Sequence, residues 1–157
     1  MKSNVRLIWA IFIVLALSIL PMPEWLSAFR PPWVLLLILY IQFCIPVYFN
    51  VGLIFVLGLC LDVLLGSVIG EHIFALLLTA WLASGFSRRF TFFPIGQQML
   101  LIMILAMIYQ SILLLTNAFL GYAYLSLTVL CSSLLSLMLW PWIRILADGS
   151  FHKVSKT

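Results

Sequence analysis

Long apolar runs without any charged residue alternate with short polar or turn-forming segments along the chain. No charge lies between Arg89 and Arg144, and this stretch is long enough for two membrane crossings of about 20 residues each. A second uncharged run lies between Arg30 and Asp62 and is broken by turn-forming residues at 46–52. Continuous apolar runs of this length predict membrane-spanning helices rather than the one-sided helices of a water-soluble domain.

The breaks between these runs predict six membrane-spanning helices. A shorter apolar run lies between the polar pairs at 71–72 and 88–89, and a turn is expected near 117–124. The predicted spans cover about residues 7–24, 32–48, 51–69, 73–87, 97–118 and 123–145. We therefore expect one all-α membrane domain over residues 1–157, built as a polytopic helical bundle. The uncharged turn at 46–50 leaves one alternative open, since a re-entrant loop there would reduce the count to four.

The composition agrees with a membrane protein. Hydrophobic residues make up 66% of the chain and charged residues 8%, whereas soluble domains have roughly 45–50% and about 25%. The mean hydropathy is +1.27. So few charged residues could not cover the surface of a 157-residue domain in water.

The charged residues indicate how the spans are oriented. With six spans, one side of the membrane carries all but one of the basic residues, namely Lys2, Arg6, Arg88, Arg89, Arg144, Lys153 and Lys156. Arg30 lies on the other side, together with the acidic Glu24 and Glu71. Because cytoplasmic loops are enriched in lysine and arginine, both termini are predicted to be cytoplasmic. In a bacterial cell this describes a multi-pass protein of the inner membrane.

The N-terminal segment combines a basic start with an apolar run, which is also the pattern of a cleaved signal peptide. It has no small-x-small cleavage site, and it ends in the sequence PMP at 21–23. We therefore interpret it as a retained first span.

One acidic residue falls inside an apolar run. Gly58, Asp62, Gly66 and Gly70 are spaced four apart, so on a continuous helix they form one face. A charged side chain in the membrane costs roughly 3 kcal/mol or more unless it is paired or protonated, and small residues allow another backbone to approach closely. We expect Asp62 to be a buried structural acid that faces the bundle, with Arg30 as its charged partner. A proton or ion relay is the alternative, but no second acid lies in the interior of a predicted span.

The sequence FRPPW at 29–33 opens the second predicted span. Pro31 suits the first turn of a helix, because proline lacks a backbone N–H and an N–H at this position has no partner within the helix. Trp33 suits the membrane interface. We interpret this segment as a rigid helix entry on the outer side. The alternative is that Arg30 bends inward to Asp62 or contacts a partner.

The last predicted span carries two further candidate sets. Ser132 and Ser136 form a small-xxx-small patch of the kind that lets helices pack closely in lipid. Near the cytoplasmic end, Trp140, Pro141 and Trp142 predict a helix kink with two anchors at the level of the lipid headgroups. Docking of a partner helix is the alternative for both sets.

The sequence gives little support for catalysis or nucleic-acid binding. It contains four acidic residues and two histidines, and it lacks GxSxG, HExxH, GxGxxG and P-loop motifs. The cysteines at 44, 60 and 131 lie in apolar runs without metal-ligand spacing. The basic tail around Lys153 and Lys156 suits the anionic inner leaflet rather than nucleic acid. We therefore expect no enzyme activity, no cofactor and no bound metal.

Five short motifs are spread along the chain, namely PMP at 21–23, FRPPWVLLL at 29–37, NVG at 50–52, GLCLDVLLGSVIG at 58–70 and LWPW at 139–142. Together these motifs resemble the MreD family, the rod shape-determining membrane proteins of bacteria. They extend over nearly the whole chain, although the segment 88–125 contains no matching motif. Within them, the resemblance selects Arg30, Asp62, Gly66 and Gly70, without implying any catalytic role.

The resemblance implies a non-enzymatic subunit of the cell-elongation machinery. Such a protein associates with MreC, a bitopic protein with a large periplasmic domain, and through MreC with the MreB filament and the peptidoglycan synthase pair. Its fold is expected to resemble the six-helix substrate-binding subunits of energy-coupling-factor transporters. Those subunits dock a scaffold through an AxxxA pattern, whereas Ala10 and Ala16 are six residues apart here. A vitamin-type transporter subunit is the alternative function, and contacts with membrane lipids and self-association are left open.

Overall fold

The computed structural model describes residues 2–20, 31–119, 121 and 127–151. Regular secondary structure in these ranges is helical throughout. The elements are α1 (Lys2–Ile19), α3 (Trp33–Cys44), the 3-10 turn η1 (Pro46–Tyr48), α4 (Val51–Leu65), α5 (Glu71–Ser84), α6 (Ser87–Phe90), α7 (Ile95–Phe119) and α8 (Leu127–Phe151). The all-α prediction is confirmed for this part of the chain.

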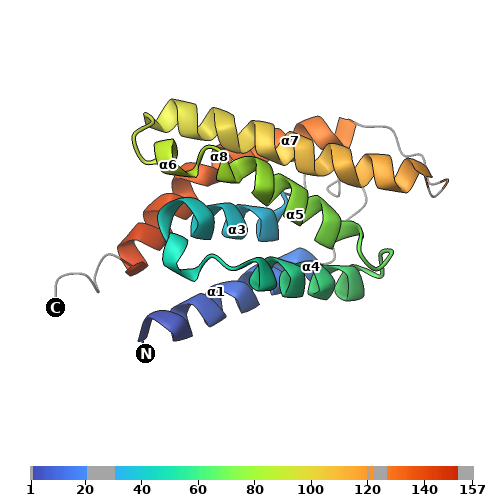
Figure 1. Ribbon diagram of the computed structural model, residues 1–157, viewed down its shortest axis with the longest axis horizontal. Coiled ribbons are helices and arrows are strands. Elements are labelled where there is room, and N and C mark those ends of the chain that lie inside the picture. Colours follow the sequence, from blue (N-terminus) through green and yellow to red (C-terminus); the bar gives the residue numbers. More distant parts are fainter. Residues whose placement is uncertain (1, 21–30, 120, 122–126, 152–157) are drawn as a thin grey trace.

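The central helix of the bundle is α3. It is apolar on all sides, with the sequence WVLLLILYIQFC, and a helix of this kind must be covered all round. It contacts α1, α5, α6, α7 and α8, and Figure 1 shows it between α1 and the pair formed by α7 and α8. Leu36 and Leu39 near its middle are completely buried. The core of the bundle is therefore built around α3.

The two ends of the bundle differ in charge. Arg88 and Arg89 belong to α6, which lies at the same end as the start of α1 and the end of α8 (Figure 1). The connection between α4 and α5 lies at the opposite end, beside Asp62, Glu71 and His72. The basic and acidic side chains named here are thus separated along the long axis of the molecule.

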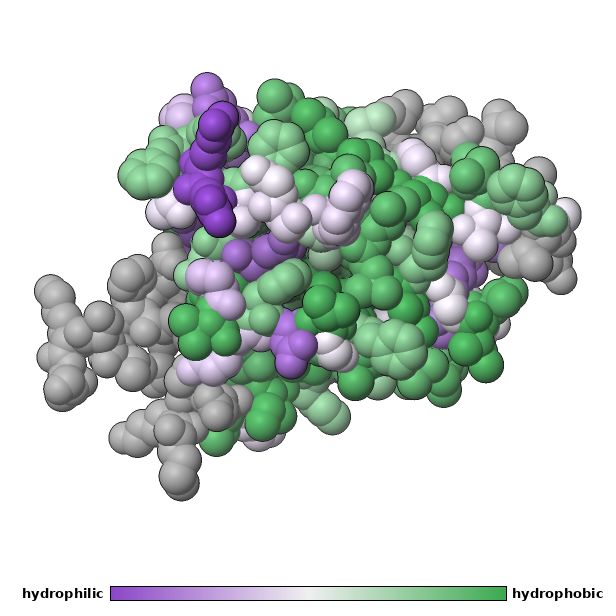
Figure 2. Space-filling model, viewed as in Figure 1, coloured by the Kyte–Doolittle hydropathy of each residue, from purple (hydrophilic) through white to green (hydrophobic). Residues whose placement is uncertain are grey.

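A broad apolar surface covers the sides of the bundle. Trp9 and Phe12 on α1, Trp81 on α5 and Trp142 on α8 are each more than half exposed. Figure 2 shows apolar residues over most of the visible face, with the most hydrophilic residues over α6. An apolar surface of this extent marks contact with a membrane or with other proteins rather than with water.

One helix in the described part, α7, is long and apolar enough to cross a membrane, by the criteria of length and composition. Shorter apolar helical stretches occupy Leu7–Ile19, Trp33–Cys44, Val51–Leu65, Glu71–Ser84 and Cys131–Ile145. A helix of 15 residues, such as α4, is about 22 Å long, whereas the hydrocarbon core of a bilayer is about 30 Å thick. Apolar helices therefore lie in the predicted regions, and the number of crossings stays a prediction.

The predicted span at 51–69 is too long, because α4 ends at Leu65. Gly66 is the C-cap of this helix, with φ 63°, and its N–H donates to the backbone oxygen of Asp62. Gly70 also has a positive φ, 103°. Glycine readily adopts this left-handed conformation, which ends a helix. The prediction of one helical face through Gly58, Asp62, Gly66 and Gly70 is therefore wrong beyond Asp62. The end of the first predicted span, at 21–24, lies outside the described residues.

Candidate functional site

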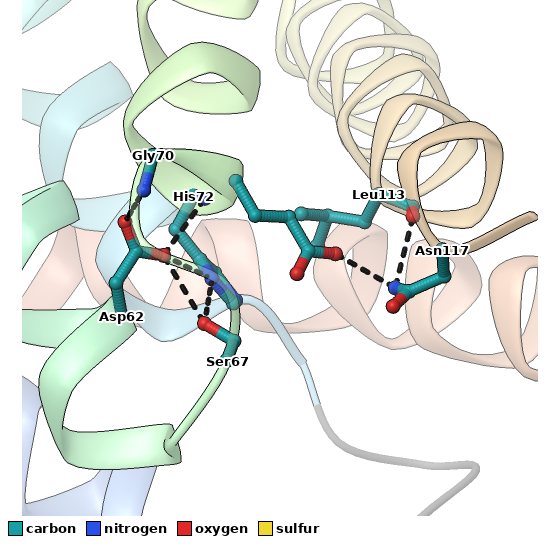
Figure 3. A network of polar contacts seen from close by, with 7 residues as sticks. Asp62, Ser67, Gly70, His72, Leu113 and Asn117 are labelled. Atoms are coloured by element: carbon teal, nitrogen blue, oxygen red, sulfur yellow. Dashed lines mark hydrogen bonds and ion pairs between the residues drawn. The ribbon is translucent and has the colours of Figure 1, made fainter. Parts of the chain in front are cut away.

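The carboxylate of Asp62 organises the turn between α4 and α5. Its Oδ2 accepts a hydrogen bond from the backbone N–H of Gly70 at 2.7 Å, and its Oδ1 accepts one from the backbone N–H of His72 at 2.9 Å (Figure 3). α5 begins at Glu71, and its N-cap residue Gly70 offers no side-chain cap. The first N–H groups of a helix have no partner within the helix, and a negative charge is favourable beside them. Asp62, from the preceding helix, therefore caps α5.

Two further side chains of the described part contact this carboxylate. His72 Nδ1 lies 2.9 Å from Asp62 Oδ1, and Ser67 Oγ lies 3.2 Å from each of these two atoms. Because the carboxylate is an acceptor, Nδ1 carries the proton that His72 donates to it. Asp62 is only 1% exposed. A buried acid needs such partners, and this one finds them within ten residues of its own chain.

The partners that Asp62 has among the described residues are ones that the sequence did not suggest. Arg30 lies outside the described residues, so its pairing with Asp62 stays a prediction. On a continuous helix Gly70 would lie about 12 Å along the axis from Asp62, but the turn at Gly66 brings the two residues into hydrogen-bond contact. Sequence reasoning missed His72 as a partner for this reason. Gly66 and Gly70 were the sequence feature that could have predicted this turn, since glycine is the usual residue where a helix ends in the left-handed conformation.

Gly58 lies one turn before Asp62 on α4. A Cβ atom at this position would lie 2.7 Å from Cα and 2.9 Å from Cγ1 of Ile73 on α5. Contacts this short do not occur, so α4 and α5 pack closely only because residue 58 has no side chain. The predicted close approach of two backbones is therefore present at Gly58. At Gly66 and Gly70, by contrast, a Cβ atom would meet nothing within 4 Å.

A second acid links the start of α5 to α7. Asn117 donates from Nδ2 to Glu71 Oε1 at 2.7 Å and to the backbone oxygen of Leu113 at 3.0 Å (Figure 3). Glu71 lies before the predicted span at 73–87, and burial raises the pKa of its carboxyl group, while His72 and the hydrogen bond from Asn117 lower it by less. Sequence reasoning placed Asn117 at the end of the fifth predicted span, where it could bond to another helix, but did not identify Glu71 as its partner. The Asp62 network and the Glu71–Asn117 pair together fix the start of α5.

The two serines proposed as an outer contact patch point inward. Ser132 is 3% exposed and Ser136 is completely buried. Gln110 on α7 donates from Nε2 to Ser132 Oγ at 2.8 Å, and Ser136 Oγ donates to the backbone oxygen of Ser132 at 3.0 Å. Hydroxyl groups in an apolar protein find hydrogen-bond partners inside the bundle, since lipid offers none. The alternative that this patch docks a partner helix is therefore wrong, and the patch joins α8 to α7.

The two tryptophans near the end of α8 have different surroundings. Trp140 is completely buried, and its ring contacts Phe90 at a centroid distance of 5.7 Å and Tyr40 at 6.5 Å. Trp142 is 67% exposed. Pro141 lies between them inside α8. The prediction of two headgroup-level anchors is therefore wrong for Trp140, because α6 and α3 cover it, and it stays open for Trp142.

A cavity of about 330 Å³ lies beside the Asp62 network. Its lining includes Trp33, His72, Tyr109, Gln110 and the buried Pro31. Trp33 stands at the start of α3, and its Nε1 is buried without a hydrogen-bond partner among the residues that the structure describes. The cavity can hold water or a small polar group. Clusters of His, Cys, Asp and Glu that could bind a metal ion are not found among the described residues.

Comparisons with known proteins agree on one family. The family model described as rod shape-determining protein MreD matches residues 1–148, a range that includes the whole Asp62 network. A curated relative, the rod shape-determining protein MreD of Haemophilus influenzae, is 27% identical over 142 residues, which cover 90% of this chain and 88% of that protein. No solved structure matches the chain.

Proposed function

The chain belongs to the MreD family of rod shape-determining proteins, and from this premise we propose that it is a non-enzymatic subunit of the cell-elongation machinery. In this role it helps to control rod shape and lateral peptidoglycan synthesis. The observation that carries the proposal is the family match, which extends over residues 1–148. The comparisons give no support to the alternative of a vitamin-type transporter subunit.

The polar groups of the bundle support a structural role. Asp62 holds the backbone at the start of α5, Glu71 joins α5 to α7, and Ser132 joins α8 to α7. Each of these contacts ties one helix to another. A scaffold protein needs helices that keep fixed positions, since its function is to present a constant surface to its partners.

We propose that the protein crosses the inner membrane six times with both termini in the cytoplasm. The separation of basic and acidic residues along the bundle supports this orientation. Arg88 and Arg89 lie at the end that contains the start of α1, whereas Asp62 and Glu71 lie at the other end. Basic residues gather on the cytoplasmic side of membrane proteins. The short helices require a locally thin bilayer, which membranes tolerate at modest cost.

We further propose that MreC binds through its single membrane helix to the outer face of α1. Val5, Ile8, Trp9 and Phe12 are exposed and follow the spacing of one helical face. α1 packs mainly on α3 and α4, and no other described helix covers its opposite side to a comparable extent. A single helix docks on a face of this kind through residues spaced three and four apart. MreB and the peptidoglycan synthase pair are then reached through MreC.

A clean deletion tests the proposed function. Loss of the protein should turn rods into spheres and leave nutrient uptake normal, and in cells that keep a tagged copy of the protein, MreC should be recovered with it from native membranes. Normal rods after deletion, with loss of uptake of a nutrient, would overturn the proposal.

A further inference from the structure

A second cavity lies at the α6 end of the bundle, away from the Asp62 network. It has a volume of about 560 Å³ and is bounded by residues of α3, η1, α6, α7 and α8. Its walls combine apolar side chains, such as Phe43 and Phe49, with the cationic Arg88 and Arg144. The lining, as far as the described residues form it, contains no aspartate or glutamate. The cavity is therefore partly apolar and positively charged.

A buried amide orients one of the two cations. Gln98 is 1% exposed, and its Nε2 donates to the backbone oxygens of Phe90 at 3.2 Å and Phe93 at 2.8 Å. These two bonds fix which way the amide faces, so its Oε1 accepts a hydrogen bond from Arg144 Nη1. That bond holds one Nη atom of the planar guanidinium group in place beside the cavity. Gln98 is thus a positioning residue for Arg144.

We propose that this cavity binds the headgroup of an anionic phospholipid. The phosphate group is recognised by Arg88 and Arg144, and the first part of the acyl chains lies against Phe43 and Phe49. Basic pockets between membrane helices suit anionic headgroups, and planar guanidinium groups match phosphate oxygens. Free phosphate offers the same charge but has no apolar part for the aromatic wall. The mixed lining therefore favours a lipid.

The position of the cavity supports the same conclusion. It lies at the end of the bundle where Figure 2 shows the most hydrophilic residues next to the apolar sides. In a membrane this is the level at which headgroups and acyl chains meet. The inference goes beyond the proposed function, because it requires neither MreC nor a role in cell shape.

Two neighbouring arginines provide a matched pair of variants. Both side chains are exposed, but Arg88 lines the cavity and Arg89, the next residue of the same short helix, does not. The experiment is native mass spectrometry of the purified full-length protein in detergent, titrated separately with phosphatidylglycerol, phosphatidylcholine and inorganic phosphate. We expect the wild type to retain one phosphatidylglycerol in preference to phosphatidylcholine. Arg88→Gln should weaken this retention about five-fold, the effect of one basic residue on an anionic lipid, and Arg89→Gln should leave it unchanged.

A second variant separates orientation from charge. Arg144→Lys keeps the positive charge but loses the planar group that Gln98 orients, so retention should fall while thermal unfolding in the absence of lipid stays within a few degrees of the wild type. The proposal is overturned if both Gln variants weaken retention equally, since that indicates diffuse surface charge. It is also overturned if phosphatidylglycerol is not retained, or if inorganic phosphate binds with the same dependence on Arg88 and the lipid does not.

Discussion

Asp62 and His72 are joined twice, because one carboxylate oxygen accepts hydrogen bonds from both the backbone N–H and the Nδ1 of His72, each at 2.9 Å. The first contact fixes the backbone at the start of α5, and the second fixes the imidazole ring. The end of α4 and the start of α5 are thereby held together as one unit. This relationship explains an acid within an apolar run: Asp62 supplies the cap that the glycine at position 70 cannot provide.

Substitutions of Asp62 should rank by the hydrogen bonds that they keep. Asp62→Asn retains one oxygen for His72 but turns an NH2 group toward the N–H of Gly70, so we expect a loss of about 1–3 kcal/mol in unfolding free energy. Asp62→Leu should lose more, because the buried donors of Gly70 and His72 are then unpaired. Thermal unfolding of the purified variants in one detergent checks the order. Equal melting temperatures for wild type and both variants would contradict the capping role.

The close packing of α4 on α5 predicts that Gly58→Ala is destabilising. The added Cβ atom would lie 2.7 Å from the backbone Cα of Ile73, so the two helices must move apart. Overpacking of this kind typically costs about 1–3 kcal/mol. Gly96→Ala on α7 is the matched control, since nothing lies within 4 Å of a Cβ atom there and alanine favours a helix by up to about 1 kcal/mol. If both variants unfold at the same temperature, the inferred contact is absent.

At Gly66 the cost of substitution should come from the backbone conformation alone. Its φ is 63°, and a Cβ atom would meet nothing within 4 Å. Residues with a Cβ atom pay about 1–2 kcal/mol in this conformation, and asparagine pays less. Gly66→Ala and Gly66→Leu should therefore be destabilised equally, with Gly66→Asn between them and the wild type. A much larger effect of leucine than of alanine, measured by thermal unfolding, would indicate a packed surface at this position instead.

These residues show how far the sequence determines the structure. The uncharged apolar runs predict where the helices lie, because length and charge are local properties of the chain. The end of α4 depends on the conformation of Gly66, and hydropathy does not distinguish a glycine that continues a helix from one that ends it. The direction of Ser136 depends on how α8 is rotated in the bundle, and that rotation follows from contacts with α7. The Asp62 network could not be predicted, since it requires the turn that Gly66 creates.

The proposed orientation predicts which turns a membrane-impermeant thiol reagent can reach. Ile69, in the turn between α4 and α5, is 74% exposed, and Phe92, after α6, is 87% exposed. In a variant whose three cysteines are replaced by alanine, Ile69→Cys should be labelled in cells whose outer membrane alone is permeabilised. Phe92→Cys should be labelled only after the inner membrane is opened. If Phe92→Cys is labelled before the inner membrane is opened and Ile69→Cys is not, the orientation is the reverse of the proposed one. If both positions are labelled at that stage, the chain does not cross the membrane between residues 69 and 92.

If MreC docks on α1, a change of shape on that face should weaken its capture without unfolding the protein. Trp9 on α1 is 62% exposed, and Trp81 on α5 is 70% exposed on a different helix, so the two offer the same substitution at two surfaces. Leucine is as compatible with lipid as tryptophan but removes the large ring that a partner helix would pack against. Large aromatic residues that anchor an interface carry about 2 kcal/mol or more of the binding energy, and their removal then lowers the affinity roughly 30-fold.

We expect Trp9→Leu to reduce co-purification of MreC and to make cells rounder. Trp81→Leu should behave as the wild type, and both variants should reach normal membrane levels. The opposite ranking of the two variants would move the MreC site from α1 to the face that contains Trp81.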